Sequence, residues 1–216
     1  MIPKIIHQIW IGDQSKKPSK LMQTWKDNHP DWEYILWTEA EIDSFNLFNR
    51  DKYDIHPMLS GKADIARYEI LFKFGGFFID ADSISIKSLD DLLDNKFVTV
   101  YESEKHRKNL LANGYFGCTP KNRIMFNMIN NVRNLETNRM INRHAWETTG
   151  PLPFTNEVHK SEVKILQSIA FIPVHFEEKD FSSLNISSIS DEEIEFLIEK
   201  YPDSYSYQFW GSKSNY

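Results

Sequence analysis

One stretch in the first half of the chain predicts three secondary-structure elements in immediate succession. Ser60 is followed by apolar residues at three- and four-residue spacings, which predicts a helix capped by the serine side chain. Gly75-Gly76 would end that helix, because glycine tolerates the left-handed conformation found at helix C-termini. Residues 77–79 then predict a buried strand, and the alternating residues 83–86 predict a half-buried one.

The segment before this stretch alternates strand and helix patterns. We expect a strand at residues 4–11, a helix opened by Ser19, and a strand at residues 33–37. Thr38 and Glu41 have the spacing of a capping box and predict a short helix after that strand. The alternation predicts an α/β fold with a Rossmann-like, mainly parallel sheet flanked by helices.

The segment after it continues with less regular signals. We expect a strand at 97–101, a helix begun by Pro120, one or two strands within 165–176, and an acidic helix capped by Ser190 and Glu193. Residues 46–57 and the tail at 205–213 show neither a helix nor a strand period. We see no internal repeat and no linker, so residues 1–216 are expected to form a single domain.

Two carboxylates follow the predicted buried strand. Asp80 and Asp82 are two residues apart, which in an extended segment places both on one side. Paired carboxylate oxygens at the rim of a sheet suit Mg²⁺ or Mn²⁺ carrying a diphosphate. The alternative is a solvated turn, because Asp favours turns.

Composition limits the function classes. The chain has 216 residues, and its formal net charge of -6 argues against non-specific nucleic-acid binding. No run approaches the length needed to span a membrane, and no signal peptide is visible, so we expect a cytoplasmic enzyme or a chain from which an anchor has been removed. The lone cysteine, Cys118, fits a reducing compartment. We expect a monomer or a weak oligomer.

The central stretch resembles the donor-site signature of DXD-motif GT-A glycosyltransferases. It is most similar to the Och1-like family of yeast mannosyltransferases and bacterial capsular sugar transferases, and more distantly to the clostridial glucosylating toxins. The residues that carry the resemblance are Ala63, Asp64, Arg67, Leu71, Gly75, Gly76, Phe78, Asp80 and Asp82. The resemblance implies a GT-A fold, a nucleotide-sugar donor, a glycan or other hydroxyl acceptor, and retention of anomeric configuration.

The resemblance also implies roles for the motif residues. Asp82 would bind Mn²⁺ (or Mg²⁺) directly, and Asp80 would reach the metal through water and also the ribose. Asp64 and Arg67 would hold the sugar hydroxyls and the leaving phosphate, which makes Asp64, Arg67 and Asp82 the catalytic candidates. The alternative for Asp64 and Arg67 is a surface ion pair, since they are three residues apart on a helix.

Two further residues match donor-binding positions of the family. Trp10 ends the first predicted strand, and the matching tryptophan in the family stacks on the donor base; the alternative is a core tryptophan. Asn113 resembles an asparagine beside the donor sugar; the alternative is a turn residue, because Asn-Gly is a hairpin signal. His7 is expected to be a hydrogen-bonded structural histidine.

The C-terminal tail departs from the family pattern. Relatives place a histidine near a Gly-Ser-Trp, where it completes the metal site, but this chain has Gln208 and lacks that histidine. Gln208 could supply a carbonyl oxygen to the metal, and Ser212 a hydroxyl to the metal or phosphate. Trp210 would cover the donor, and we expect residues 203–216 to form a lid.

Two other function classes remain open. A phosphatase of the haloacid-dehalogenase type also carries Asp-x-Asp after an apolar strand, but usually near the start of its domain and with Thr or Val two residues later, where this chain has Ile84. A non-catalytic nucleotide-sugar-binding module with a decayed metal site would fit the C-terminal departure. The sequence does not distinguish UDP-glucose, UDP-galactose, UDP-GlcNAc and GDP-mannose as the donor.

Overall fold

A six-stranded sheet lies at the centre of the computed structural model, which describes residues 1–178, 186 and 188–211. The strand order is β2-β1-β3-β6-β5-β7, and β6 is the strand that runs antiparallel to both of its neighbours. All other neighbouring strands are parallel. The strands are β1 (Ile5–Ile9), β2 (Glu33–Trp37), β3 (Gly76–Ile79), β5 (Phe97–Ser103), β6 (Arg107–Cys118) and β7 (Lys164–Leu166).

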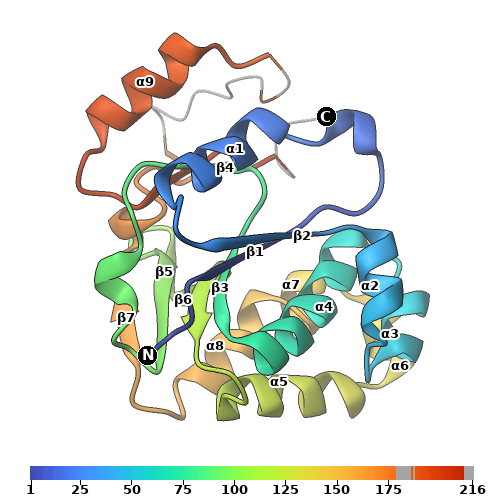
Figure 1. Ribbon diagram of the computed structural model, residues 1–216. Helices are drawn as coiled ribbons and strands as arrows, with labels where there is room; N and C mark the ends of the chain where they lie inside the picture. The colour runs from blue at the N-terminus through green and yellow to red at the C-terminus, as the bar shows by residue number, and fades with distance from the viewer. Residues whose placement is uncertain (179–185, 187, 212–216) are drawn as a thin grey trace.

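A smaller sheet and two helices cover one face of the large sheet (Figure 1). The smaller sheet pairs β4 (Ser83–Ser85) with β8 (Ser206–Gln208) in antiparallel fashion. Helix α1 (Ser19–Asn28) packs against β4, where Trp25 Nε1 donates to the carbonyl of Ser83 at 3.1 Å. Helix α9 (Asp191–Lys200) lies at the outer edge of this layer.

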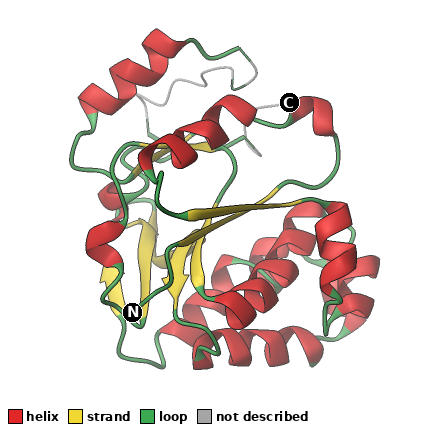
Figure 2. Cartoon of the chain, in the orientation of Figure 1, coloured by secondary structure: helices red, strands yellow, loops and turns green. Residues whose placement is uncertain are grey.

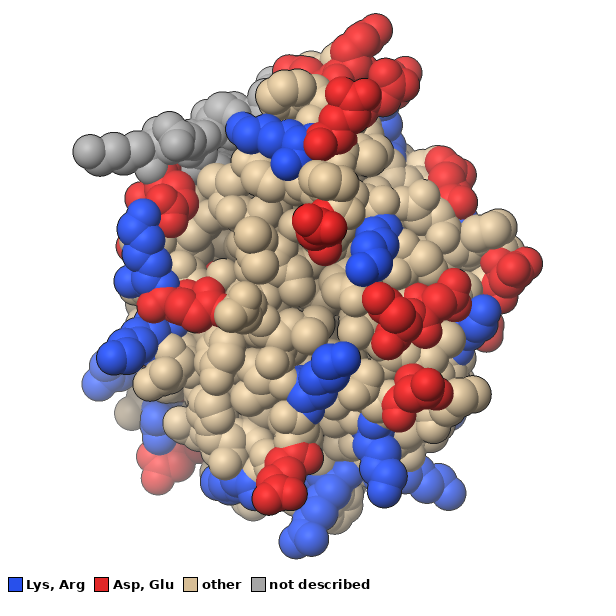
Figure 3. Space-filling view, turned by 90° about the vertical axis from the view of Figure 1, so that its left-hand side faces the viewer, with Lys and Arg blue, Asp and Glu red and all other residues tan. Residues whose placement is uncertain are grey.

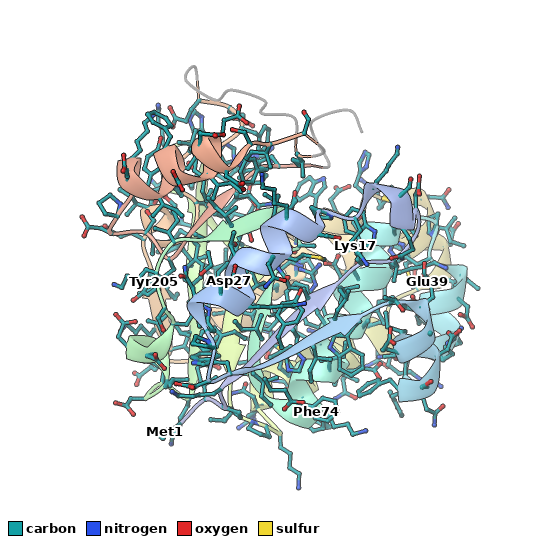
Figure 4. The ribbon with its side chains drawn as sticks, turned by 45° about the horizontal axis from the view of Figure 1, so that its top comes forward. Met1, Lys17, Asp27, Glu39, Phe74 and Tyr205 are labelled. Atoms are coloured by element: carbon teal, nitrogen blue, oxygen red, sulfur yellow. The ribbon has the colours of Figure 1, made fainter. Side chains whose placement is uncertain are left out.

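The remaining helices lie on the opposite face (Figure 2). They are α2 (Glu39–Phe45), α3 (Arg50–Ile55), α4 (Leu59–Phe74), α5 (Arg123–Arg133), α6 (Thr137–Asn142), α7 (Ala145–Thr148) and α8 (Pro151–Val158). Short 3-10 turns occur at Gln14–Lys16, Asp90–Leu92 and Ser168–Ala170. Figure 4 labels Lys17 and Asp27 on the α1 side and Phe74, at the end of α4, on the other side.

The core extends over both faces of the sheet at β3. Phe77 and Phe78 are both about 1% exposed and belong to different apolar clusters, because successive strand residues point to opposite faces. Helix α4 is buried on nearly all sides, including Asp64 and Arg67. Gly75 and Gly76 have φ of 67° and 90°, which allows the sharp turn from α4 into β3.

The sequence-based fold class is confirmed, as a mixed α/β fold with a mainly parallel sheet. Both predicted capping boxes are present, and in the first of them the Thr38 N–H donates to the Glu41 carboxylate at 2.9 Å. His7 is structural: Trp37 Nε1 donates to its Nδ1, so its Nε2 carries the proton and donates to the Gly75 carbonyl.

Four local predictions are wrong. Ser60 does not cap α4, which begins at Leu59. Pro120 does not open α5, because Asn122 caps that helix with a side-chain oxygen that accepts from the Ile124 N–H. Residues 46–57, expected to be irregular, contain α3, and the tail, expected to lack a strand, contains β8. Tertiary packing of Tyr53 and Tyr207 stabilises these two elements, whose local patterns are weak.

The surface mixes charges of both signs. Figure 3 shows Lys and Arg interspersed with Asp and Glu, and acidic side chains gather at the top, where α9 lies. Among the described residues, none of the helices combines the length and apolar character needed to cross a bilayer.

Candidate active site

The carboxyl ends of three parallel strands meet at one edge of the large sheet. Trp10 follows β1, Asp80 follows β3, and Glu102 is the second-last residue of β5. In open α/β sheets ligands bind at this edge. The sequence-predicted residues that the structure brings together here are Trp10, Arg67, Asp80, Asp82, Gln208 and Trp210, which line a first cleft of about 540 Å³.

Asp80 and Asp82 line this first cleft, and Arg67 lies close to Asp80. Arg67 Nη1 lies 3.5 Å from Asp80 Oδ1, and the Asp80 N–H donates to the Gly114 carbonyl. Burial raises the pKa of Asp82 to about 6, and the nearby Asp80 charge adds to the shift. Burial likewise raises the pKa of Asp80, against the opposing effect of Arg67.

Asp64 and Arg67 are not a surface ion pair. Asp64 is 4% and Arg67 6% exposed, and their closest charged atoms are 3.5 Å apart. Asp64 accepts from Asn113 Nδ2 at 2.8 Å and from Thr149 Oγ1 at 3.0 Å. Burial raises the pKa of Asp64, although Arg67 and these donors oppose the shift.

Arg67 is fixed by contacts on several sides. Its Nη1 donates to the Asn113 carbonyl at 2.6 Å, and its guanidinium lies 4.1 Å from the Phe78 ring centroid. Asn113 therefore lies inside β6 and connects Asp64 to Arg67, and it is not the turn residue of a hairpin. A rigid arginine fork next to Asp80 suits the binding of phosphate or hydroxyl oxygens.

The C-terminal segment binds Asp82 directly. Gln208 Nε2 donates to Asp82 Oδ1 at 2.9 Å, and the Gly211 N–H donates to Asp82 Oδ2 at 2.6 Å. The Tyr115 hydroxyl donates to Gln208 Oε1. The Gln208 oxygen thus faces Tyr115, while its amide nitrogen faces the carboxylate where a cation would sit.

The described part of the expected lid is largely built into the fold. Tyr205, Tyr207 and Phe209 are buried; Tyr207 lies within β8, and the other two flank that strand. Trp210 follows with φ of 55° and lines the first cleft. Ser212 and the rest of residues 212–216 lie outside the described residues.

Trp10 is half-buried and lines the first cleft. Its backbone N–H continues the sheet by donating to the Trp37 carbonyl, and its Nε1 donates to the Asp13 carbonyl at 3.1 Å. Its ring is held at the rim and lines the cleft, unlike Trp25, which is fully buried.

Two further hollows meet the first cleft at Asp80 and Trp210. A second cleft of about 450 Å³ is lined by Asp64, Glu102, Trp146 and others, and a small cavity of about 110 Å³ lies beside Glu102 and Asn113. The site therefore consists of one cleft that contains Trp10 and another beyond Asp80.

A different hollow, of about 610 Å³, lies on the α4 and α5 side and is lined mainly by apolar residues. Its carboxylate, Glu69, accepts from the N–H groups of Phe48 and Asn49 and so holds a loop in place. Despite its larger volume we do not favour it as the active site, because Glu69 is the one carboxylate among its described lining residues and is already bound to the backbone.

The sequence analysis did not assign three residues that shape this site. Thr149 donates to Asp64 through its hydroxyl, and Glu102 lines the second cleft and the small cavity. Gly114 leaves room for Asp80, since a β-carbon at position 114 would lie 2.2 Å from Asp80 Oδ2. The position of a carboxylate at the end of a parallel strand is a sequence signal that would have identified Glu102.

The donor set fits a hard divalent cation. Asp80 and Asp82 are half-buried; burial raises the pKa of both carboxyl groups, and the Asp80 charge adds to the shift at Asp82. A cation between them would relieve this repulsion, and oxygen ligands match Mg²⁺ and Mn²⁺.

Comparisons with known proteins agree with this geometry. Residues 15–98 match the family described as the glycosyltransferase sugar-binding region containing the DXD motif, which here includes Asp64, Arg67, Asp80 and Asp82. The chain is 39% identical over 99 residues to inositol phosphoceramide mannosyltransferase 3 of Schizosaccharomyces pombe, covering 43% of this chain and 27% of that protein.

A second relative extends the match along the chain. Mannosyl phosphorylinositol ceramide synthase CSH1 of Saccharomyces cerevisiae is 30% identical over 188 residues, covering 77% of this chain and 48% of that protein. The chain thus spans about half or less of the length of these two relatives.

A solved structure shares the fold. The PaToxG glycosyltransferase superposes with a TM-score of 0.57 at 18% identity, over 74% of this chain and 69% of that one. The fold is the GT-A fold. Through residues 15–98 the chain belongs to the family of glycosyltransferase sugar-binding regions that contain the DXD motif.

Proposed function

We propose that this chain is a divalent-metal-dependent glycosyltransferase that moves a sugar from a nucleotide-sugar donor to a hydroxyl acceptor. The observation that carries the proposal is the pair Asp80 and Asp82, which line a cleft together with Trp10 and Arg67. Residues 1–216 would act as one GT-A domain.

The first cleft would bind the nucleotide part of the donor. Trp10 would stack on the base, and Asp80 would reach the ribose, as in the family that the sequence resembles. The diphosphate would then lie near Asp80 and Asp82, where Mn²⁺ or Mg²⁺ would neutralise the charge that develops on the leaving phosphate.

The sugar would extend past Asp80 into the second cleft. Asp64 and Arg67 are held rigidly by Asn113 and Thr149, so they are positioned to hold sugar hydroxyls without reorganising. Retention of anomeric configuration is proposed from the family resemblance. The reaction would replace the sugar–phosphate bond with a bond to the acceptor oxygen.

The C-terminal segment would close the site over the donor. Gly211 and Gln208 already contact Asp82, and Trp210 lines both clefts and the small cavity. Closure would exclude water, which competes with the acceptor for the sugar. Because Gln208 directs its amide nitrogen at Asp82, it would serve as a metal ligand only after its side-chain amide turns over.

The names of the two relatives suggest a first donor and acceptor to test. Both names indicate transfer of mannose, and both refer to an inositol-containing ceramide lipid. We therefore propose GDP-mannose as the first donor and a phosphoinositol lipid as the first acceptor, ahead of UDP-sugars and free glycans.

The test measures Mn²⁺-dependent binding and hydrolysis across GDP-mannose, UDP-glucose, UDP-galactose and UDP-GlcNAc. Asp80→Asn and Asp82→Asn should each remove metal-dependent hydrolysis, and Asp82→Asn should lower calorimetric affinity for the nucleoside diphosphate with Mn²⁺. Asp90→Asn is the matched control, because Asp90 forms an exposed ion pair with Lys4. Full hydrolysis by either site variant in EDTA would exclude metal assistance.

A non-catalytic nucleotide-sugar-binding module is the second candidate. Position 208 is where relatives place a histidine, and the Gln208 side-chain oxygen there accepts from the Tyr115 hydroxyl; this contact favours the second candidate. Such a module would bind a nucleotide sugar in the calorimeter but would neither hydrolyse it nor transfer its sugar to any acceptor in the panel.

A further inference from the structure

We propose that Glu102 is a sugar-binding residue, whose carboxylate accepts hydrogen bonds from hydroxyl groups of the transferred sugar. The inference rests on the proposed function and adds to it a specificity-determining contact outside the DXD motif and outside the Asp64–Arg67 pair. It concerns recognition of a polyhydroxyl ring, and it assigns Glu102 no bond-making or bond-breaking step.

The first argument is the position of Glu102 in the sheet. β5 runs parallel to β3 and β1, because β6 is antiparallel to both β3 and β5. Glu102 therefore lies at the same edge as Asp80 and Trp10, at the carboxyl ends of the strands. The three residues extend along this edge, with Asp80 on the middle strand of the three that carry them.

The second argument is the local irregularity of the β5–β6 pair. Tyr101 pairs with Leu111 and Ser103 pairs with Arg107, so the register shifts around Glu102. Such bulges redirect side chains and are frequent beside active sites. A further shift between Thr99 and Val100 leaves residues 113–115 of β6 without partners in β5.

The small cavity of about 110 Å³ lies where the two strands lose their register. Glu102 lines it from β5, and Asn113 and Gly114 line it from β6. Asp80 lines it as well, so the cavity adjoins the proposed metal site. A sugar attached to a diphosphate at Asp80 would therefore lie beside this space as well as the second cleft.

The third argument is the unused hydrogen-bonding capacity of the Glu102 carboxylate. His175 Nε2 lies 3.4 Å from Glu102 Oε1, and Arg107 Nε lies 4.0 Å from the same oxygen. His175 Nδ1 accepts from the Glu177 N–H, so Nε2 carries the proton and donates to Glu102. These contacts hold the carboxylate but leave acceptor sites for a ligand.

The other carboxylates of the second cleft have fewer open acceptor sites. Asp64 accepts from Asn113 and Thr149 and lies next to Arg67, and Asp80 belongs to the proposed metal site. Among the described residues that line this cleft, Glu102 is therefore the carboxylate with the most open capacity, and it would add to the sugar contacts proposed for Asp64. A carboxylate binds hydroxyl groups by short, charge-assisted hydrogen bonds, which suits a sugar ring.

The position also separates Glu102 from the nucleotide. Glu102 lines the second cleft and the small cavity, whereas the cleft that contains Trp10 does not include it. A change at Glu102 should therefore alter the binding of the sugar and leave the binding of the nucleoside diphosphate unchanged.

The experiment compares Glu102→Gln and Glu102→Asp with the wild type and with Glu104→Gln. Glu104 is the matched control, because its exposed carboxylate accepts from Ser168, on a neighbouring turn. Calorimetry with Mn²⁺ would use UDP, GDP and the four nucleotide sugars named above, and kinetics would use the sugar that the wild type hydrolyses. Melting temperatures would report on folding.

Glu102→Gln should keep the affinity for UDP or GDP within about twofold and lower kcat/KM for the nucleotide sugar by about 10- to 100-fold. The kcat/KM of Glu102→Asp should lie between those of the wild type and Glu102→Gln. In the wild type, removal of one particular hydroxyl from the sugar of the active donor should lower kcat/KM. In Glu102→Gln, removal of the same hydroxyl should have little further effect, because the contact is already absent.

Three results would overturn the inference without touching the proposed function: unchanged sugar kinetics in Glu102→Gln, equal losses with UDP or GDP, or equal losses in Glu104→Gln. If the wild type binds none of the nucleotides with Mn²⁺, the proposed function fails first, and the inference fails with it. If Glu102→Gln does not fold, Glu102→Asp with the monodeoxy donors decides the question.

Discussion

Gly114 and Asp80 approach each other so closely that a side chain at position 114 would have to displace the Asp80 carboxylate. A β-carbon there would lie 2.2 Å from Asp80 Oδ2 and 2.6 Å from its carboxyl carbon. Gly114 lies in β6, Asp80 directly follows the neighbouring antiparallel strand β3, and the Asp80 N–H donates to the Gly114 carbonyl at 3.0 Å. Glycine at this position therefore determines where the Asp80 carboxylate can point.

Gly114→Ala should displace the Asp80 carboxylate. We expect the free energy of unfolding to fall by about 1–3 kcal/mol, the usual range for overpacking. We also expect the affinity for a nucleoside diphosphate with Mn²⁺ to fall by about tenfold or more, since a displaced carboxylate no longer contacts the metal or the ribose correctly. Urea denaturation and calorimetry measure the two effects.

A double-mutant cycle with Asp80→Ala is the control for this prediction. Without the Asp80 carboxylate, the alanine at position 114 loses its clash partner, so the second substitution should add little to the first. Additive losses of stability would mean that Gly114 is required for a reason unrelated to Asp80.

Trp10→Ala should weaken binding of the nucleoside diphosphate by about 1–3 kcal/mol, the range for base–aromatic stacking. Trp10 is half-buried and lines the cleft, so its loss should change the melting temperature only modestly. Trp146→Ala is the control, because Trp146 is 44% exposed and lines the second cleft. Unchanged nucleotide affinity together with a large drop in melting temperature would show that Trp10 acts as a core residue.

Because of His7, the folded protein should become less stable in mild acid. Burial lowers its pKa from 6.5 to about 4, against the opposing hydrogen bond to the Gly75 carbonyl. The unfolded state then binds more protons than the folded state below pH 6.5, so stability is fully present above that pH and is lost as pH falls towards 4. Between pH 7 and pH 5 this amounts to about 2 kcal/mol.

The measurement is the free energy of unfolding in urea at pH 7 and pH 5 for the wild type and His7→Phe. The variant should be less stable at pH 7, because Trp37 and the Gly75 carbonyl lose their partner. Its decrease between the two pH values should be about 2 kcal/mol smaller than that of the wild type. Replacement of the exposed His159 by phenylalanine is the control, and the free energy of unfolding of that variant should decrease between pH 7 and pH 5 as much as that of the wild type. Equal decreases in wild type and His7→Phe would exclude His7 as the cause.

The elements with strong local signals could be predicted from the sequence. β2 has the bounds expected for it, and both capping boxes form, because alternation and side-chain caps are short-range effects. The start of α4 was wrong by two residues, since its N-cap is Met58 and not Ser60, and burial on nearly all sides fixes this helix more strongly than a serine cap does. The strand β8 was missed because its pairing partner, β4, lies more than a hundred residues earlier.

The candidate site also contains residues that a local motif identifies and contacts that only the tertiary structure creates. Asp80, Asp82, Asp64 and Arg67 could be identified because a contiguous motif carries them. The hydrogen bonds from Asn113 and Thr149 to Asp64 join three distant segments, and no local pattern encodes them. The space around Glu102 depends on register shifts between β5 and β6, which hydrophobic periodicity does not reveal.

The final prediction concerns the segment that follows β8. The Phe209 N–H donates to the Asp82 carbonyl at 2.9 Å, and the Gly211 N–H donates to its carboxylate. Truncation after Pro202 would remove this contact and also the buried Tyr205, Tyr207 and Phe209. Each buried aromatic stabilises by about 1.5–3 kcal/mol, so we expect a large fall in melting temperature even without ligand.

Truncation after Gly211 separates a role in closure from this role in folding. It keeps β8 and the contacts of Gly211 with Asp82, so the melting temperature without ligand should remain close to that of the wild type. If the segment closes over the donor, the increase in melting temperature produced by Mn²⁺ with a nucleotide sugar should shrink, because residues that bind only the closed state stabilise it only when ligand is present. Amide exchange at residues 205–211 should slow on addition of both ligands in the wild type and slow less in the truncated chain. Equal protection in the two proteins would show that residues 212–216 take no part in closure. Equal exchange with and without ligands in the wild type would show that residues 205–211 do not move on binding and do not form a lid.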